Sequence, residues 1–256
     1  SSAASDVYKR QGEIETTSAE HSEAFEQFMQ WAEDVARLNV RMNAETTPDI
    51  EAGYQFNAKG IGLVRTEHMF FGAERLVEMR RFILSSDDAT RKAALDKIRA
   101  YQTEDFEQIF RLSGERPTIV RLLDPPLHEF LPKSEDEIQN VAQQLAIPVE
   151  KLNKRILELH ETNPMLGHRG CRLAITYPEL YVMQAEAIMN SVAQLQQEGI
   201  HCQPEIMIPL VSTVEEFKIL QTQIVEAIQR IETKTDQTLH FLMGTMIETP
   251  RACMIA

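Results

Sequence analysis

The feature that most constrains the fold is a regular alternation of short apolar runs with longer segments of helical periodicity. Residues 205–211 (EIMIPLV) are almost continuously apolar, which is typical of a strand buried on both faces. A second apolar run spans residues 241–247, and a segment of helical periodicity lies between the two runs. Strands that alternate with helices in this way predict a parallel sheet with helices packed outside it.

Six segments are predicted as strands or strand ends, and six longer ones as helices. The strands are residues 38–44, 59–71, 117–132, 163–173, 205–211 and 239–248. The helices are residues 18–39, 74–84, 87–112, 134–145, 149–160 and 212–231, and a seventh helix opens at residues 176–179. The pair Thr176 and Glu179 fits a capping box at that helix start, whereas residues 46–49 are predicted as a loop.

The first residues are expected to lie outside the folded domain. Residues 1–11 are small, polar and patternless, which is typical of a non-native lead. We therefore expect residues 1–17 to be an unstructured lead and residues 18–256 to form one partial domain.

Composition excludes several classes of function. A net charge of −13 argues against non-specific nucleic-acid binding and against a basic membrane surface. No apolar run approaches the roughly 20 residues that a membrane-spanning helix needs. The 3 cysteines show no paired spacing, so reduced thiols in the cytoplasm are expected. A local arginine cluster could still bind a small anion.

A single carboxylate closes the apolar run near residue 247. Glu248 is followed by Thr249 and Pro250, which suit the cap and first position of a helix. Glu248 is therefore predicted at the carboxyl end of a strand, where parallel α/β folds bind their ligands. A carboxylate in that place could coordinate a metal or pair with an arginine.

Three arginines are predicted at the same end of other strands. Arg121 lies within an apolar run, where a charge is costly unless it is paired or binds an anion, and Asp124 is its nearest candidate partner. Arg65 closes residues 59–65, and Arg169 lies in a Gly-His-Arg-Gly turn. Each arginine could instead form an ordinary ion pair, but together with Glu248 they suggest a site for a metal-bound anion.

Five segments resemble the phosphoenolpyruvate-binding domain of the pyruvate, phosphate dikinase family, over residues 39–256. They are GIGLVRTEHMFF, RLLDPPLHEFLP, NPMLGHRGCRL, PEIMIPLV and GTMIETPRA, in this order. RTEHMFF and RLLDPPLHEF favour the dikinases. Phosphoenolpyruvate synthase and enzyme I of the sugar phosphotransferase system, the alternative assignments, share only the arginines, the NPxLGxR core and the glutamate.

The resemblance implies a (β/α)8 TIM-type barrel, truncated here after about six strands, with its site at the carboxyl mouth. It implies that Arg65 and Arg121 bind phosphoenolpyruvate, with Arg169 at the same mouth. It further implies that Glu248 coordinates Mg²⁺ and contacts the substrate. This fits the chemistry, because Mg²⁺ can stabilise the pyruvate enolate as a Lewis acid and arginine binds phosphate through planar, bidentate contacts.

The family reaction converts ATP, phosphate and pyruvate into AMP, diphosphate and phosphoenolpyruvate. The resemblance implies a phosphohistidine on a swivelling domain as phosphoryl carrier, a homodimer at full length, and a location in the cytoplasm or, in a eukaryote, an organelle. The phosphohistidine, the ATP-grasp domain, a second metal ligand and the proton-donating cysteine are all expected outside this chain.

No catalytic residue is therefore assigned here, and we expect the chain to be a fragment that does not turn over alone. An alternative of another class is a non-catalytic phosphoenolpyruvate-binding module, which should bind its ligand tightly in a titration with Mg²⁺, whereas the open fragment should bind weakly or not at all.

Overall fold

The computed structural model describes residues 22–85, 87–160, 163 and 166–256, which fall into two compact units. The first unit ends at Asn39, and the second runs from Val40 to Ala256. Within the first, α2 (Glu23–Val35) begins where the Ser22 hydroxyl accepts a hydrogen bond from the Phe25 N–H. The predicted lead at residues 1–17 and the first residues of the predicted helix lie outside the described part.

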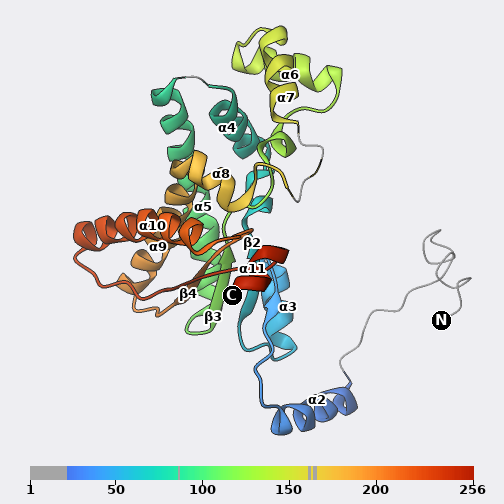
Figure 1. Ribbon diagram of the computed structural model, residues 1–256. Helices are drawn as coiled ribbons and strands as arrows, with labels where there is room; N and C mark the ends of the chain where they lie inside the picture. Colours follow the sequence, from blue (N-terminus) through green and yellow to red (C-terminus); the bar gives the residue numbers. More distant parts are fainter. Residues whose placement is uncertain (1–21, 86, 161–162, 164–165) are drawn as a thin grey trace, which may run out of the picture. The chain divides into compact units, whose positions relative to one another are not determined.

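The second unit is built on a parallel sheet (Figure 1). Across the described residues it has five strands: β1 (Met42–Asn43), β2 (Ile61–Arg65), β3 (Pro117–Arg121), β4 (Gln203–Ile208) and β5 (Leu242–Thr245). Each strand pairs with the next one in the sequence, so the spatial order is β1-β2-β3-β4-β5. A doubly wound sheet reverses its order at a switch point, whereas a barrel does not. The predicted α/β class is confirmed, and the open sheet is consistent with a truncated (β/α)8 barrel.

Register aligns the carboxyl ends of the central strands. Arg65 lies opposite Arg121, and Arg121 lies opposite Met207. Met207 in turn lies opposite Gly244 of β5. The exits from β2, β3, β4 and β5 therefore open at one edge of the sheet.

Helices connect the strands. They are α3 (Thr47–Gln55), α4 (Ala73–Leu84), α5 (Asp88–Ser113), α6 (Glu135–Leu145), α7 (Val149–Leu159), α8 (Gly170–Thr176), α9 (Pro178–Gln197), α10 (Val214–Thr235) and α11 (Pro250–Ile255), with 3-10 turns η1 (Thr66–Phe70) and η2 (Leu127–Phe130). Figure 1 shows α9 and α10 side by side next to the sheet, and α6 and α7 as a pair beyond it. α5 and α9 pack against each other. α5 also contacts β3 and α9 contacts β4, which buries the apolar faces of both helices.

Three local predictions are wrong. Residues 163–173 were predicted as a strand or its tip, but their described part forms a turn that leads into α8. Gly170 has a φ of +56°, which suits a turn and not a strand. Residues 46–49 are not a loop, because the Thr46 side chain caps α3 by accepting from the Asp49 N–H. Tyr177, and not Thr176, precedes α9, and no side chain caps that helix.

Candidate functional site

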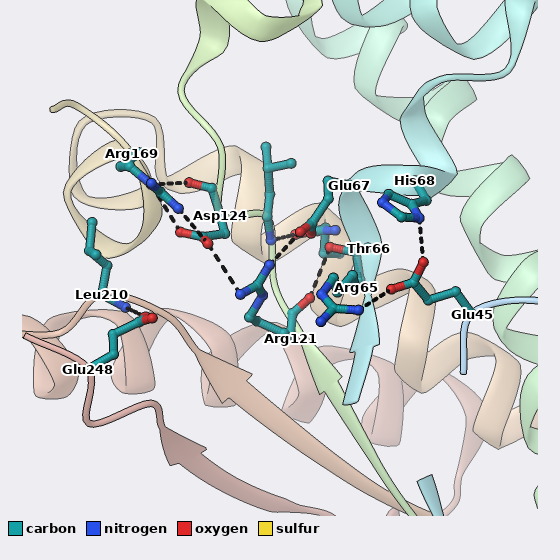
Figure 2. A network of polar contacts seen from close by, with 12 residues as sticks. Glu45, Arg65, Thr66, Glu67, His68, Arg121, Asp124, Arg169, Leu210 and Glu248 are labelled. Atoms are coloured by element: carbon teal, nitrogen blue, oxygen red, sulfur yellow. Dashed lines mark hydrogen bonds and ion pairs between the residues drawn. The ribbon is translucent and has the colours of Figure 1, made fainter. Parts of the chain in front are cut away.

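The ends of β2 and β3 bring two of the predicted arginines side by side (Figure 2). Arg65 is the last residue of β2 and Arg121 the last residue of β3. The buried Thr66 hydroxyl donates to the Arg121 carbonyl oxygen over 3.0 Å and joins the two strand exits. Register therefore places the backbones of Arg65 and Arg121 opposite each other.

Arg65 pairs with a carboxylate that sequence analysis did not single out. Its Nη1 lies 3.0 Å from Glu45 Oε1, and Glu45 Oε2 contacts His68 Nδ1. Glu45 follows the short strand β1, so it too lies at a strand end. A hollow of about 370 Å³ adjoins this group, and its lining includes Arg65, His68 and Arg75.

Arg121 is held by two carboxylates. Its Nη2 donates to Glu67 Oε1, and its Nη1 lies 3.3 Å from Asp124 Oδ2. The predicted contact with Asp124 is thus confirmed, whereas Glu67, in η1, was not predicted. The Arg121 side chain is only 12% exposed, so both contacts are shielded from water.

Arg169 joins the same network through Asp124. Arg169 Nη2 lies 2.6 Å from Asp124 Oδ2, and its Nε lies 3.3 Å from Oδ1 (Figure 2). The Gly170 N–H donates to the Asp124 carbonyl oxygen over 2.9 Å, so backbone and side chain of Asp124 both hold the start of α8. Asp124 therefore links Arg121 with Arg169.

Glu248 follows β5, and among the described residues it contacts backbone and not an arginine. Its Oε1 accepts a hydrogen bond from the Leu210 N–H over 2.8 Å. Leu210 is buried and has a φ of +64°, a conformation that costs a branched residue about 1 kcal/mol or more. Strained backbone of this kind is common at ligand sites. As predicted, Thr249 caps α11 by accepting from the Ala252 N–H.

The exit from β4 connects Glu248 with the segment of Arg169. The Cys171 N–H donates to the Pro209 carbonyl oxygen over 3.2 Å, and the Cys171 thiol donates to the Leu210 carbonyl oxygen. A side chain at Gly170 would come within 2.8 Å of the Leu210 Cβ atom. The turn at Leu210 therefore packs against the start of α8 while it holds the Glu248 carboxylate.

Buried polar groups of α9 fix the exit from β3. The Tyr181 hydroxyl donates to the Leu123 carbonyl oxygen over 2.7 Å, and Gln184 Oε1 accepts from the Leu123 N–H. Burial raises the pKa of the Tyr181 hydroxyl well above its usual value, so this group remains a donor. Sequence analysis missed both residues, because their helical spacing is that of any core position.

The predicted residues thus divide into two groups. The first group is three arginines: Arg65 and Arg121 at strand ends, and Arg169 just before α8. The acids that face them are Glu45, Glu67 and Asp124. Glu248 follows β5 at the same sheet edge and is oriented by the Leu210 N–H. The signal that could have found Glu45 and Glu67 is the one used for Glu248, an acid just after a strand.

In the described part of the chain, no set of three or more His, Cys, Asp or Glu side chains is grouped as a metal site would require. The described helices include none with the length and apolarity needed to cross a bilayer.

Comparison with known proteins places this geometry in context. Residues 19–256 match the family described as PEP-utilising enzyme, PEP-binding domain. A Rickettsia bellii protein named pyruvate, phosphate dikinase is 46% identical over 234 residues, which cover 91% of this chain and 27% of that protein. A Clostridium symbiosum protein of the same name is 43% identical over 251 residues, or 98% of this chain and 28% of that protein.

A chloroplastic Arabidopsis thaliana protein, pyruvate, phosphate dikinase 1, is 46% identical over 235 residues, or 90% of this chain and 24% of that protein. The chain thus spans about a quarter of the length of the curated relatives it matches.

Proposed function

The chain belongs to the PEP-utilising enzymes through their PEP-binding domain, and on that premise we propose that it is the phosphoenolpyruvate-binding part of a pyruvate, phosphate dikinase. The printed names of its relatives favour the dikinase over phosphoenolpyruvate synthase or enzyme I. The reaction would be that of ATP, phosphate and pyruvate to AMP, diphosphate and phosphoenolpyruvate. A phosphohistidine on a swivelling domain would carry the phosphoryl group, and the full-length enzyme would be a homodimer in the cytoplasm or an organelle.

The observation that carries this proposal is the grouping of three arginines at the ends of β2 and β3 and at the start of α8. Phosphoenolpyruvate carries a phosphate and a carboxylate, and arginine binds both groups through planar, bidentate contacts. Arg65 and Arg121 lie in register at adjacent strand ends, and Arg121 shares Asp124 with Arg169. A small molecule with two anionic groups matches arginines at adjacent strand ends.

The charges of this group support a role for a cation. Three arginines stand against four carboxylates: Glu45, Glu67, Asp124 and Glu248. The arginines are thus already neutralised, and a polyanionic substrate would be bound poorly without further positive charge. A divalent cation that enters with the substrate would supply that charge.

The donor set fits Mg²⁺ with Glu248 as the protein ligand. Leu210 orients one Glu248 oxygen, and Mg²⁺ accepts one or two carboxylates while substrate and water supply its remaining ligands. Bound there, Mg²⁺ would act as a Lewis acid on the negative charge that develops on the pyruvate oxygens. Arg65, Arg121 and Arg169 would orient the substrate and balance the charge of the transferring phosphoryl group.

Calorimetric titration of the 256-residue chain with phosphoenolpyruvate tests the proposal. We expect the weak binding of an open fragment, which requires MgCl2 and weakens further by about tenfold or more in Arg65→Met and in Glu248→Gln, since each loses a charged contact. Tight binding would favour the non-catalytic module. Glu186→Gln is the control, because Glu186 in α9 pairs with Arg99 of α5 and Arg230 of α10 and not with the arginines of the site. Binding no tighter than that of inorganic phosphate, or unchanged in Arg65→Met, would contradict the proposed function.

A further inference from the structure

Glu67 forms an unusually covered ion pair with Arg121. It lies in η1 directly after β2, and its Oε1 accepts from Arg121 Nη2 across the two strand ends (Figure 2). Glu67 and Arg121 are 13% and 12% exposed. Glu67 Oε2 and Arg121 Nε are buried and have no hydrogen-bond partner in the described part of the chain. A pair this buried is weak evidence for stability, so its presence calls for another explanation.

The contacts around Arg121 act on its orientation. Glu67 holds Nη2, Asp124 holds Nη1, and the Thr66 hydroxyl fixes the carbonyl oxygen of Arg121 itself. Because guanidinium is planar, anchors on both terminal nitrogens fix the plane of the group and not only its position. The remaining N–H groups then point in directions that the protein sets in advance.

Charge alone would make Glu67 unfavourable in a site for an anion, because a carboxylate beside Arg121 repels phosphate. We propose that Glu67 is a positioning residue, which orients the Arg121 guanidinium for the substrate phosphoenolpyruvate, and that this orientation outweighs the repulsion. This inference rests on the proposed function for the identity of the anion. Its distinctive content is that the reach of the Glu67 side chain matters more than its charge.

Two substitutions separate reach from charge. Glu67→Gln removes the charge but keeps an oxygen at the same distance for Arg121. Glu67→Asp keeps the charge but withdraws the carboxylate by one methylene. We expect the dissociation constant for phosphoenolpyruvate with MgCl2 to stay within about threefold in Glu67→Gln and to rise by about tenfold or more in Glu67→Asp, as loss of a charged hydrogen bond predicts.

A second measurement does not depend on phosphoenolpyruvate. The ¹⁵N side-chain signals of Arg121 report how strongly its guanidinium is restrained. We expect a restrained signal in the unmodified chain and in Glu67→Gln, and an averaged, mobile one in Glu67→Asp. If the unmodified chain binds no phosphoenolpyruvate, the proposed function fails, but this comparison still decides whether Glu67 positions Arg121.

Glu186→Gln and Glu186→Asp are the matched controls, because Glu186 Oε2 lies 2.7 Å from Arg99 Nη1 on the outer helices. Neither should change the Arg121 signals or the dissociation constant. The inference is overturned if Glu67→Asp binds and restrains Arg121 like the unmodified chain. It is equally overturned if Glu67→Gln is the variant that loses the restraint, since charge would then be the property that matters.

Discussion

Replacing Asp124 by asparagine should destabilise the fold far more than loss of an outer ion pair. Asp124 is 4% exposed and contacts two guanidinium groups, Arg169 at 2.6 Å and Arg121 at 3.3 Å. Asparagine has nearly the same shape, so the substitution leaves no cavity and the effect is electrostatic. Two largely covered arginines would lose one shared negative charge.

The magnitude follows from the cost of leaving a buried charge uncompensated, because Arg121 keeps Glu67 whereas Arg169 loses the Asp124 carboxylate. Removal of one partner of a buried ion pair costs about 3–5 kcal/mol in the free energy of unfolding. For a chain of this size, that loss should lower the thermal midpoint by about 6–20 °C. Glu186→Gln, which breaks a pair whose Arg99 side chain is 37% exposed, should cost about 1 kcal/mol or less.

Urea unfolding followed by far-ultraviolet circular dichroism measures both variants. The free energies of unfolding are comparable if the slope against urea concentration is unchanged. The reasoning is refuted if Asp124→Asn loses no more stability than Glu186→Gln. That result would mean that water screens the contacts among Asp124, Arg121 and Arg169.

Four further predictions concern the elements around the site. Gly170→Ala should lower the thermal midpoint more than Gly199→Ala. Both glycines have positive φ, but of the two only Gly170 would bring its added Cβ close to another atom, the Leu210 Cβ at 2.8 Å. Equal losses would contradict this close packing. Thr213→Ala should lower the free energy of unfolding in urea by about 1 kcal/mol, because Thr213 forms a capping box with Glu216 at the start of α10. Thr213→Ser keeps the hydroxyl and should lose much less. Iodoacetamide at pH 8 should label exposed Cys253 before buried Cys171. The thiolate is the reactive form, and burial raises the pKa of the Cys171 thiol to about 12. Early labelling of Cys171 would show that α8 opens. Burial also raises the pKa of the Cys202 thiol to about 11. The unfolded chain releases both thiol protons at lower pH than the folded one, so the free energy of unfolding should fall as the pH rises above about 9, and Cys171→Ser should reduce this dependence without abolishing it.

Much of the fold could be predicted from the sequence because its strands are apolar and its helices periodic. Residues 59–71, 117–132 and 205–211 contain β2, β3 and most of β4, and the parallel sheet follows from their alternation with helices. The error at residues 163–173 arose because they lie between two predicted helices, where the alternation of strands and helices predicts a strand. Gly170 has a positive φ and begins α8, and the described part of the segment contributes no strand to the sheet.

The site was predictable only in part. Arg121 was recognisable because a charge within an apolar strand needs a partner. Glu45 and Glu67 each come soon after a strand, but the sequence does not say which arginines they face. The register between strands brings them to Arg65 and Arg121. The contact of Glu248 depends on the left-handed backbone conformation of Leu210. Leucine rarely adopts that conformation, so no local sequence pattern predicts it.

The central claim is that one sheet edge holds phosphoenolpyruvate and a divalent cation together. Mn²⁺ accepts the oxygen ligands that suit Mg²⁺, and as a paramagnetic ion it speeds ³¹P relaxation of a phosphate held beside it. With Mn²⁺ present, the chain should raise the ³¹P relaxation rate of phosphoenolpyruvate well above the protein-free value, and Glu248→Gln should abolish that increase. An increase that persists in Glu248→Gln, or none in the unmodified chain, would contradict the account.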